Sequence, residues 1–179
     1  MKPIGIANGK ISAMVKYMRF LFLWMGTAAL TWTFYAADEI RLAQSILAAA
    51  SLWTLGLLQR WRHSALFGLV TFVLLAAIGI YRELPFGWLF AGALYAYFAY
   101  NLSRFYLRLR YLARQKQDTK SVTRVHFIRL ALLMLAGLLL SSISLLLQQA
   151  LDTAWIIFLL VSTLAVIGIL LAWTRKDAF

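Results

Sequence analysis

Six apolar stretches, separated by polar breaks, occupy most of this 179-residue chain. A helix needs about 20 apolar residues to cross the hydrocarbon core of a bilayer. Because backbone polar groups find no water there, a crossing segment must satisfy its hydrogen bonds internally, as a helix does. We therefore predict an all-α integral membrane protein with six transmembrane helices in a single membrane domain, residues 1–179. The predicted spans are 17–37, 42–59, 64–81, 86–103, 129–149 and 153–173.

The breaks between these stretches predict how the helices are grouped. Those at 38–41, 60–63 and 82–85 are short, and short connections join antiparallel neighbours. The last two stretches form a further hairpin. Between the fourth and fifth stretches lies a longer basic connector, 104–128. The predicted architecture is a four-helix group followed by a C-terminal hairpin, with no soluble domain.

The basic residues predict the orientation of the chain. Of the 18 Lys and Arg residues, all but Arg41 and Arg82 fall on the side that carries both termini and the 104–128 connector. Short loops rich in Lys and Arg remain in the cytoplasm. We therefore expect both termini to be cytoplasmic and the protein to lie in a prokaryotic plasma (inner) membrane. Since topology accounts for the net charge of +12, we expect no nucleic-acid partner.

The residue types needed for catalysis and cofactor binding are scarce. The chain has no Cys and two His residues, His63 and His126, both in or beside predicted cytoplasmic loops. The six acidic residues lie in loops or at span ends, whereas intramembrane ion pathways place ionisable residues inside the spans. We therefore expect no enzyme activity, no cofactor and no bound metal.

Aromatic and small residues predict how the helices meet lipid and one another. Tryptophan favours the membrane–water interface, and four tryptophans fall near predicted span ends: Trp61, Trp88, Trp155 and Trp173. Small residues four apart let membrane helices approach closely. Gly92 with Ala96, and Gly137 with Ser141, have this spacing.

The most informative polar pattern lies at the end of the fourth span. Tyr97, Asn101, Arg104 and Arg108 are spaced i, i+4, i+7 and i+11, which places them on one helical stripe. Arg110 and Arg114 form a second i, i+4 pair, and nothing after Pro85 breaks a helix before Ala113. A basic and aromatic helix end suits a layer of anionic lipid headgroups. The pattern favours simple anchoring and orientation of the helix end; the functional alternative is that these six residues bind anionic lipid or a protein partner at the cytoplasmic face.

A second polar group lies toward the opposite side, at Thr31, Gln44 and Gln148. These side chains could line a pocket for a neutral or amphipathic solute, although Ser, Thr and Gln in spans also serve helix packing. Two functions follow. The first is an accessory, assembly or scaffold subunit without catalytic apparatus, acting through its basic face. The alternative is a small transport module, a permease or solute-binding membrane subunit.

Overall fold

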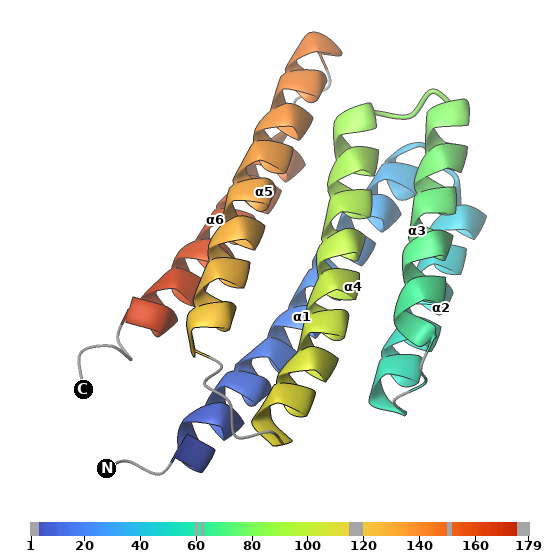
Figure 1. The fold of residues 1–179 in the computed structure, drawn as a ribbon. Coiled ribbons are helices and arrows are strands. Elements are labelled where there is room, and N and C mark those ends of the chain that lie inside the picture. The colour runs from blue at the N-terminus through green and yellow to red at the C-terminus, as the bar shows by residue number, and fades with distance from the viewer. Residues whose placement is uncertain (1–3, 60, 62, 115–119, 150–151, 175–179) are drawn as a thin grey trace.

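The computed structural model describes the chain except residues 1–3, 60, 62, 115–119, 150–151 and 175–179. The side chains of 4–13, 110, 112–114, 120–122, 165–166 and 168–174 are also outside the description. Every regular element in the described chain is an α-helix, as predicted (Figure 1). The helices are α1 (Ile4–Ala36), α2 (Ile40–Leu58), α3 (Ser64–Tyr81), α4 (Phe86–Arg114), α5 (Lys120–Leu147) and α6 (Thr153–Thr174).

Three helices are long and apolar enough to cross a membrane by length and composition: α2, α3 and the Thr123–Leu147 part of α5. The described apolar part of α6, Thr153–Leu164, is shorter. Helices α1 and α4, with 33 and 29 residues, are not among these three in the described part of the chain, and α4 has the lowest mean hydropathy of the six helices. These findings support a membrane protein; the number of spans remains a prediction.

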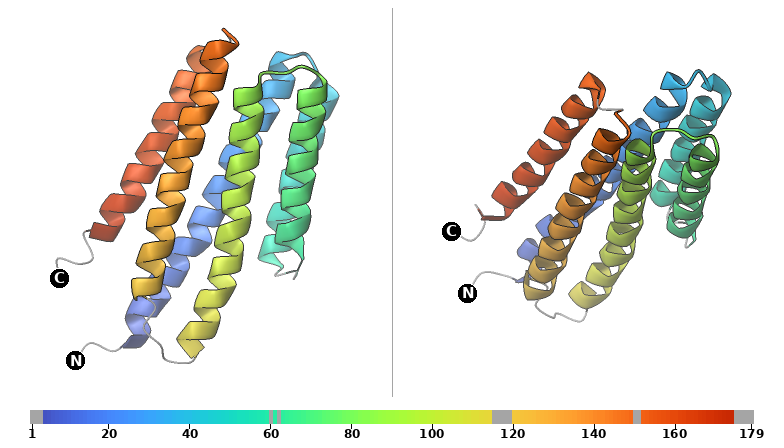
Figure 2. Two further views of the ribbon diagram at one scale, coloured as in Figure 1. Left: turned by 45° about the horizontal axis from the view of Figure 1, so that its top comes forward. Right: turned by 90° about the horizontal axis from the view of Figure 1, so that it is seen from above.

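Helix α4 lies at the centre of the bundle, where it contacts α1, α3 and α5. Helices α2 and α3 lie on one side of the α1–α4 pair, and α5 and α6 lie on the other (Figure 2). The α1–α4 contact is close because Gly26 faces Gly92: a Cβ added to Gly92 would lie 2.5 Å from Leu30 Cγ. Ala96 is buried in the same contact. The predicted close approach at Gly92 and Ala96 is confirmed.

Helix α6 is attached through aromatic packing. Trp155 is 0% exposed, and its ring lies edge-on to Trp88 with centroids 4.7 Å apart. Its indole N–H donates to Ser142 Oγ at 3.2 Å, and its backbone N–H donates to Asp152 Oδ1, which caps the helix. Trp88 and Trp155 lie near the starts of α4 and α6, but both rings pack inside the protein instead of facing outward. Trp61 is 65% exposed, and Trp173 lies outside the described side chains.

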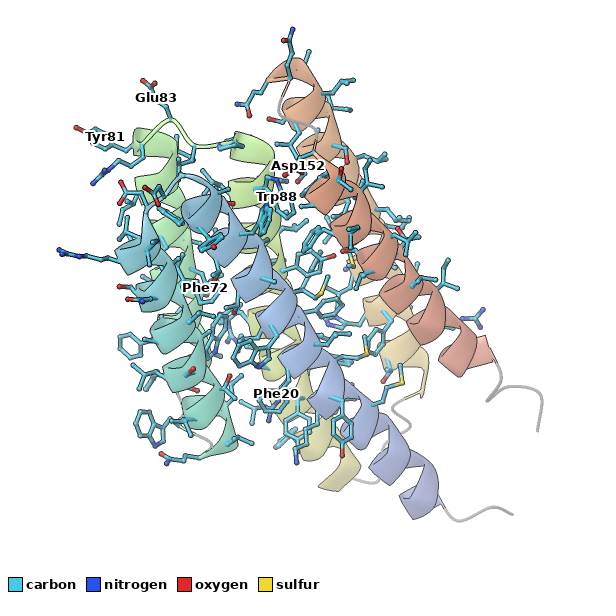
Figure 3. The ribbon with its side chains drawn as sticks, turned by 180° about the vertical axis from the view of Figure 1, so that it is seen from behind. Phe20, Phe72, Tyr81, Glu83, Trp88 and Asp152 are labelled. Atoms are coloured by element: carbon cyan, nitrogen blue, oxygen red, sulfur yellow. The ribbon has the colours of Figure 1, made fainter. Side chains whose placement is uncertain are left out.

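The turns that follow α1, α3 and α5 lie at the same end of the bundle, opposite the start of α1 and the end of α6 (Figure 1). Figure 3 shows Glu83 and Asp152 at this end and Phe20 toward the other. Two of the turns are joined by an ion pair between Arg82 Nη1 and Glu39 Oε1 at 2.6 Å. Acidic side chains thus gather at one end, and one of its two arginines is already paired with a carboxylate.

Candidate functional site

The predicted stripe on α4 forms one wall of a hollow against α5. Helix α4 continues without a break to Arg114, and α5 begins at Lys120, so most of the predicted 104–128 connector is helical. We name the hollow between the two helices the basic groove. It has a volume of about 690 Å³ and is lined by Tyr97, Tyr100, Asn101, Arg104, Phe105, Arg108, Val125, His126 and Arg129. Four of the six predicted residues therefore share one site.

Contacts along the walls hold several groove side chains in place. Asn101 Nδ2 donates to the Tyr97 hydroxyl at 3.3 Å, and Arg104 Nη1 donates to the Tyr100 hydroxyl at 3.0 Å. Across the groove, the His126 ring stacks on Phe105, with centroids 3.9 Å apart and planes 13° apart. This stacking joins α4 to α5 toward the end of the bundle that lies opposite the acidic turns. It leaves the arginines as the charged groups that a ligand would meet.

The charge of the basic groove has one sign. Arg104, Arg108 and Arg129 are exposed, and no carboxylate is among its described lining residues. Guanidinium groups present several N–H donors in a planar fork that matches phosphate and carboxylate oxygens. Neighbouring cations repel one another, and a bound anion relieves that repulsion. The arrangement is thus suited to holding an anion, and the tyrosines and Val125 offer apolar surface beside it.

Sequence reasoning missed the α5 wall. From the sequence, His126 and Arg129 are expected together at the entry to the fifth span, with no part in the site on α4. Neither is near Arg104 in sequence, so no local spacing relates them. The available signal was the absence of helix breakers on either side of 115–119, which predicts two helices that continue past the apolar spans and lie side by side.

A second hollow, which we name the inner cavity, lies at the same end among α1, α2, α3 and α4. Its volume is about 600 Å³. It is lined by Lys16, Arg19, Leu57, Leu58, Trp61, His63, Ser64, Ala65, Leu66, Tyr100, Ser103, Arg104, Tyr106 and Leu107. Tyr100 and Arg104 line both hollows, so the two adjoin at this part of α4.

The remaining predicted residues have different surroundings. The backbone of α4 includes Arg110 and Arg114, but their side chains lie outside the described residues. Gln148 Oε1 accepts a hydrogen bond from the Phe86 backbone N–H at 3.1 Å and so caps α4. Gln44 is exposed on α2, and Thr31 is half-buried in α1. None of the last three lines the basic groove or the inner cavity, and the solute pocket stays a prediction.

No cluster of three metal-ligating side chains occurs in the part of the chain that the structure describes. A scan of protein-family models, a search of curated proteins and a search of solved structures each found no match for this chain. A six-helix layout alone does not define a function. The function is therefore inferred from the chemistry of the two hollows.

Proposed function

We propose that this protein is a non-enzymatic integral membrane subunit whose basic groove binds the phosphate headgroup of an anionic lipid. All six helices cross the membrane, with both termini on the cytoplasmic side. The role is that of an accessory, assembly or scaffold subunit. The observation that carries this proposal is the convergence of Arg104, Arg108 and Arg129 in one groove.

The depth of the arginines along their helices supports a headgroup ligand. Arg104 lies 18 residues after Phe86, the first residue of α4, and Arg129 lies 18 residues before Leu147, the last of α5. At 1.5 Å per residue, both are about 27 Å from the acidic end of the bundle. The hydrocarbon core is about 30 Å thick. If the acidic end lies at the outer interface, both arginines reach the inner headgroup layer.

The outer surface of α5 supports lipid rather than water as the surrounding medium. Large aliphatic side chains are exposed along its length: Leu132, Leu133, Leu135, Leu139, Leu140, Ile143, Leu146 and Leu147. A contiguous apolar surface of this kind is rare on soluble monomers. A phospholipid whose acyl chain lies along α5 would have its phosphate at the level of Arg129. The same molecule would thus satisfy the apolar surface and the basic groove.

Lipid binding by the full-length protein tests the proposal. The protein is purified in a mild detergent, and phosphatidylglycerol binding is measured by native mass spectrometry. We expect the double substitution Arg108→Gln and Arg129→Gln to weaken binding about 30-fold, because each charge facing the phosphate contributes about 1 kcal/mol. Phosphatidylcholine, which carries no net charge, should bind weakly to both proteins.

The chain offers a matched control on the same helix. Arg124 is an exposed arginine of α5 that lines neither hollow. Arg129→Gln and Arg124→Gln remove the same charge from the same end of the molecule, but only the first alters the basic groove. Equal losses of phosphatidylglycerol binding in the two variants would show diffuse attraction to the whole basic face and would contradict a defined site.

A further inference from the structure

The inner cavity is assembled from parts of the chain that are far apart in sequence. Helix α1 contributes Lys16 and Arg19, the α2–α3 turn contributes Trp61 and His63, and α4 contributes residues from Tyr100 to Leu107. Phe20, beside Arg19, lies toward this end of the bundle in Figure 3. The cavity is thus a product of helix packing, and it adjoins the basic groove at Tyr100 and Arg104 of α4.

A buried arginine sits in its wall. Arg19 is only 7% exposed, although it lines the cavity. Its guanidinium lies 4.8 Å from the centroid of the Phe20 ring and 4.9 Å from that of the Tyr106 ring. Flat contacts of this kind stabilise a cation and restrict its side chain. The charge is therefore held in position before any ligand arrives, which lowers the ordering cost of binding.

The charges around the cavity favour an anion. Lys16 lies one helical turn before Arg19, and Arg104 faces the same space from α4. No carboxylate is among the described lining residues. The hydroxyls of the two lining serines have already used their protons: Ser64 donates to the Trp61 carbonyl at 3.0 Å, and Ser103 donates to the Ala99 carbonyl at 2.7 Å. The charged groups that can meet a ligand's oxygens are Lys16, Arg19 and Arg104, with the Tyr100 and Tyr106 side chains beside them.

The apolar part of the lining restricts the ligand further. Leu57, Leu58, Leu66, Leu107 and the exposed Trp61 complete the wall. A volume of about 600 Å³ is within the range of small-molecule sites. We propose that the inner cavity binds a phosphate group, with the apolar part of a phosphate ester resting against the α2–α3 turn. This site shares Tyr100 and Arg104 with the basic groove, but its other walls come from α1 and the α2–α3 turn, and the proposal does not depend on the groove's function.

Single cysteines can report on each hollow separately, because the chain has no Cys of its own. His63→Cys places a thiol at the inner cavity, and Val125→Cys places one at the basic groove; both native residues are exposed. The rate of alkylation by a water-soluble maleimide is measured on the full-length protein in detergent. The probes are dihexanoyl phosphatidic acid, dihexanoyl phosphatidylcholine and inorganic phosphate.

We expect dihexanoyl phosphatidic acid to slow alkylation of His63→Cys about fivefold or more, a change that corresponds to about 1 kcal/mol. Dihexanoyl phosphatidylcholine, which has the same acyl chains and no net charge, should not slow alkylation of His63→Cys. Lys16→Gln should remove this protection without risk to the fold, since Lys16 is exposed. Arg19→Gln should remove it as well. Protection by inorganic phosphate alone would support the site and assign it to free phosphate rather than to an ester.

The two reporters separate the two proposals. Arg129→Gln should abolish protection at Val125→Cys and leave protection at His63→Cys unchanged, and Arg124→Gln should change neither. No protection at His63→Cys by either phosphate probe, or equal protection by phosphatidylcholine, would overturn the inner-cavity site. Protection at His63→Cys that survives the Lys16→Gln substitution would also overturn the inner-cavity site. If Val125→Cys is not protected but His63→Cys is, the result contradicts only the proposed lipid site in the basic groove.

Discussion

Trp155 shows how one side chain determines the position of a whole helix. It contacts Trp88 of α4 and donates a hydrogen bond to Ser142 of α5, so α6 is attached to two neighbours at one point. Phe158, one turn later, stacks on the same ring at 5.4 Å between centroids. An aromatic ring buried in this way contributes both area and ring geometry to stability. The ring can be buried because its indole N–H has a partner inside the protein, Ser142 Oγ.

We predict that Trp155→Ala lowers the free energy of unfolding by about 3–5 kcal/mol, because it leaves a cavity beneath α6. Trp155→Phe should cost less, since part of the ring packing remains. The measurement is the thermal midpoint of the detergent-solubilised protein, followed by circular dichroism. Trp24→Ala serves as the control, since Trp24 is partly exposed on α1 and its loss opens no internal cavity. Similar shifts for Trp24 and Trp155 would contradict the assigned role.

The inner cavity depends on how closely helix α1 packs against helix α4. Both helices come together at Gly26 and Gly92, and further along the same pair Arg19 of α1 meets Tyr106 of α4. A side chain at Gly92 would collide with Leu30, so the axes would have to separate. Since packed helices move as rigid units, a separation at the glycines would also displace the Arg19 wall of the cavity.

We predict that Gly92→Leu destabilises the protein by about 1–3 kcal/mol or more through overpacking. It should also reduce protection of His63→Cys by phosphatidic acid. Ala48→Leu makes a small-to-large change at an exposed position of α2 and should leave both quantities near the native values. Normal stability of Gly92→Leu would mean that α1 and α4 do not need this close contact.

At the scale of the whole molecule, the described charges divide between the two ends of the bundle. Glu83 and Asp152 lie at one end, while the groove and cavity arginines lie toward the other. This division agrees with the positive-inside rule if the basic end is cytoplasmic. The exposed Arg82–Glu39 pair contributes at most about 1 kcal/mol to stability. It nevertheless offsets one of the two basic residues at the acidic end.

We predict that single cysteines at Glu83 and Asp152 react with a membrane-impermeant maleimide in intact cells. Cysteines at Asn8 and His63 should react only after the membrane is permeabilised. The reason is that moving the basic end across the membrane would transfer most of the chain's Lys and Arg residues. The six-span orientation would be contradicted if Asn8→Cys is labelled in intact cells, or if Asp152→Cys is not labelled in them.

The α4 stripe could be predicted without knowledge of the tertiary fold. Helical periodicity places Tyr97, Asn101, Arg104 and Arg108 on one face, and the absence of helix breakers extends the helix beyond the apolar span to Ala113. Both inferences are local, because they depend only on the 3.6-residue repeat and on the conformational preferences of neighbouring residues. For the same reason, the all-helical class and the apolar stretches were predictable.

The contacts between side chains of different helices could not be predicted in this way. His126 and Arg129 complete the basic groove because α5 lies beside α4 in one particular register. Arg19 is buried because Gly26 and Gly92 let α1 approach α4, and Trp155 is enclosed because α6 packs over Trp88. Register and separation result from side-chain volumes fitting together along the whole length of a helix pair. No short stretch of sequence contains that information, because the fitting partners belong to different helices.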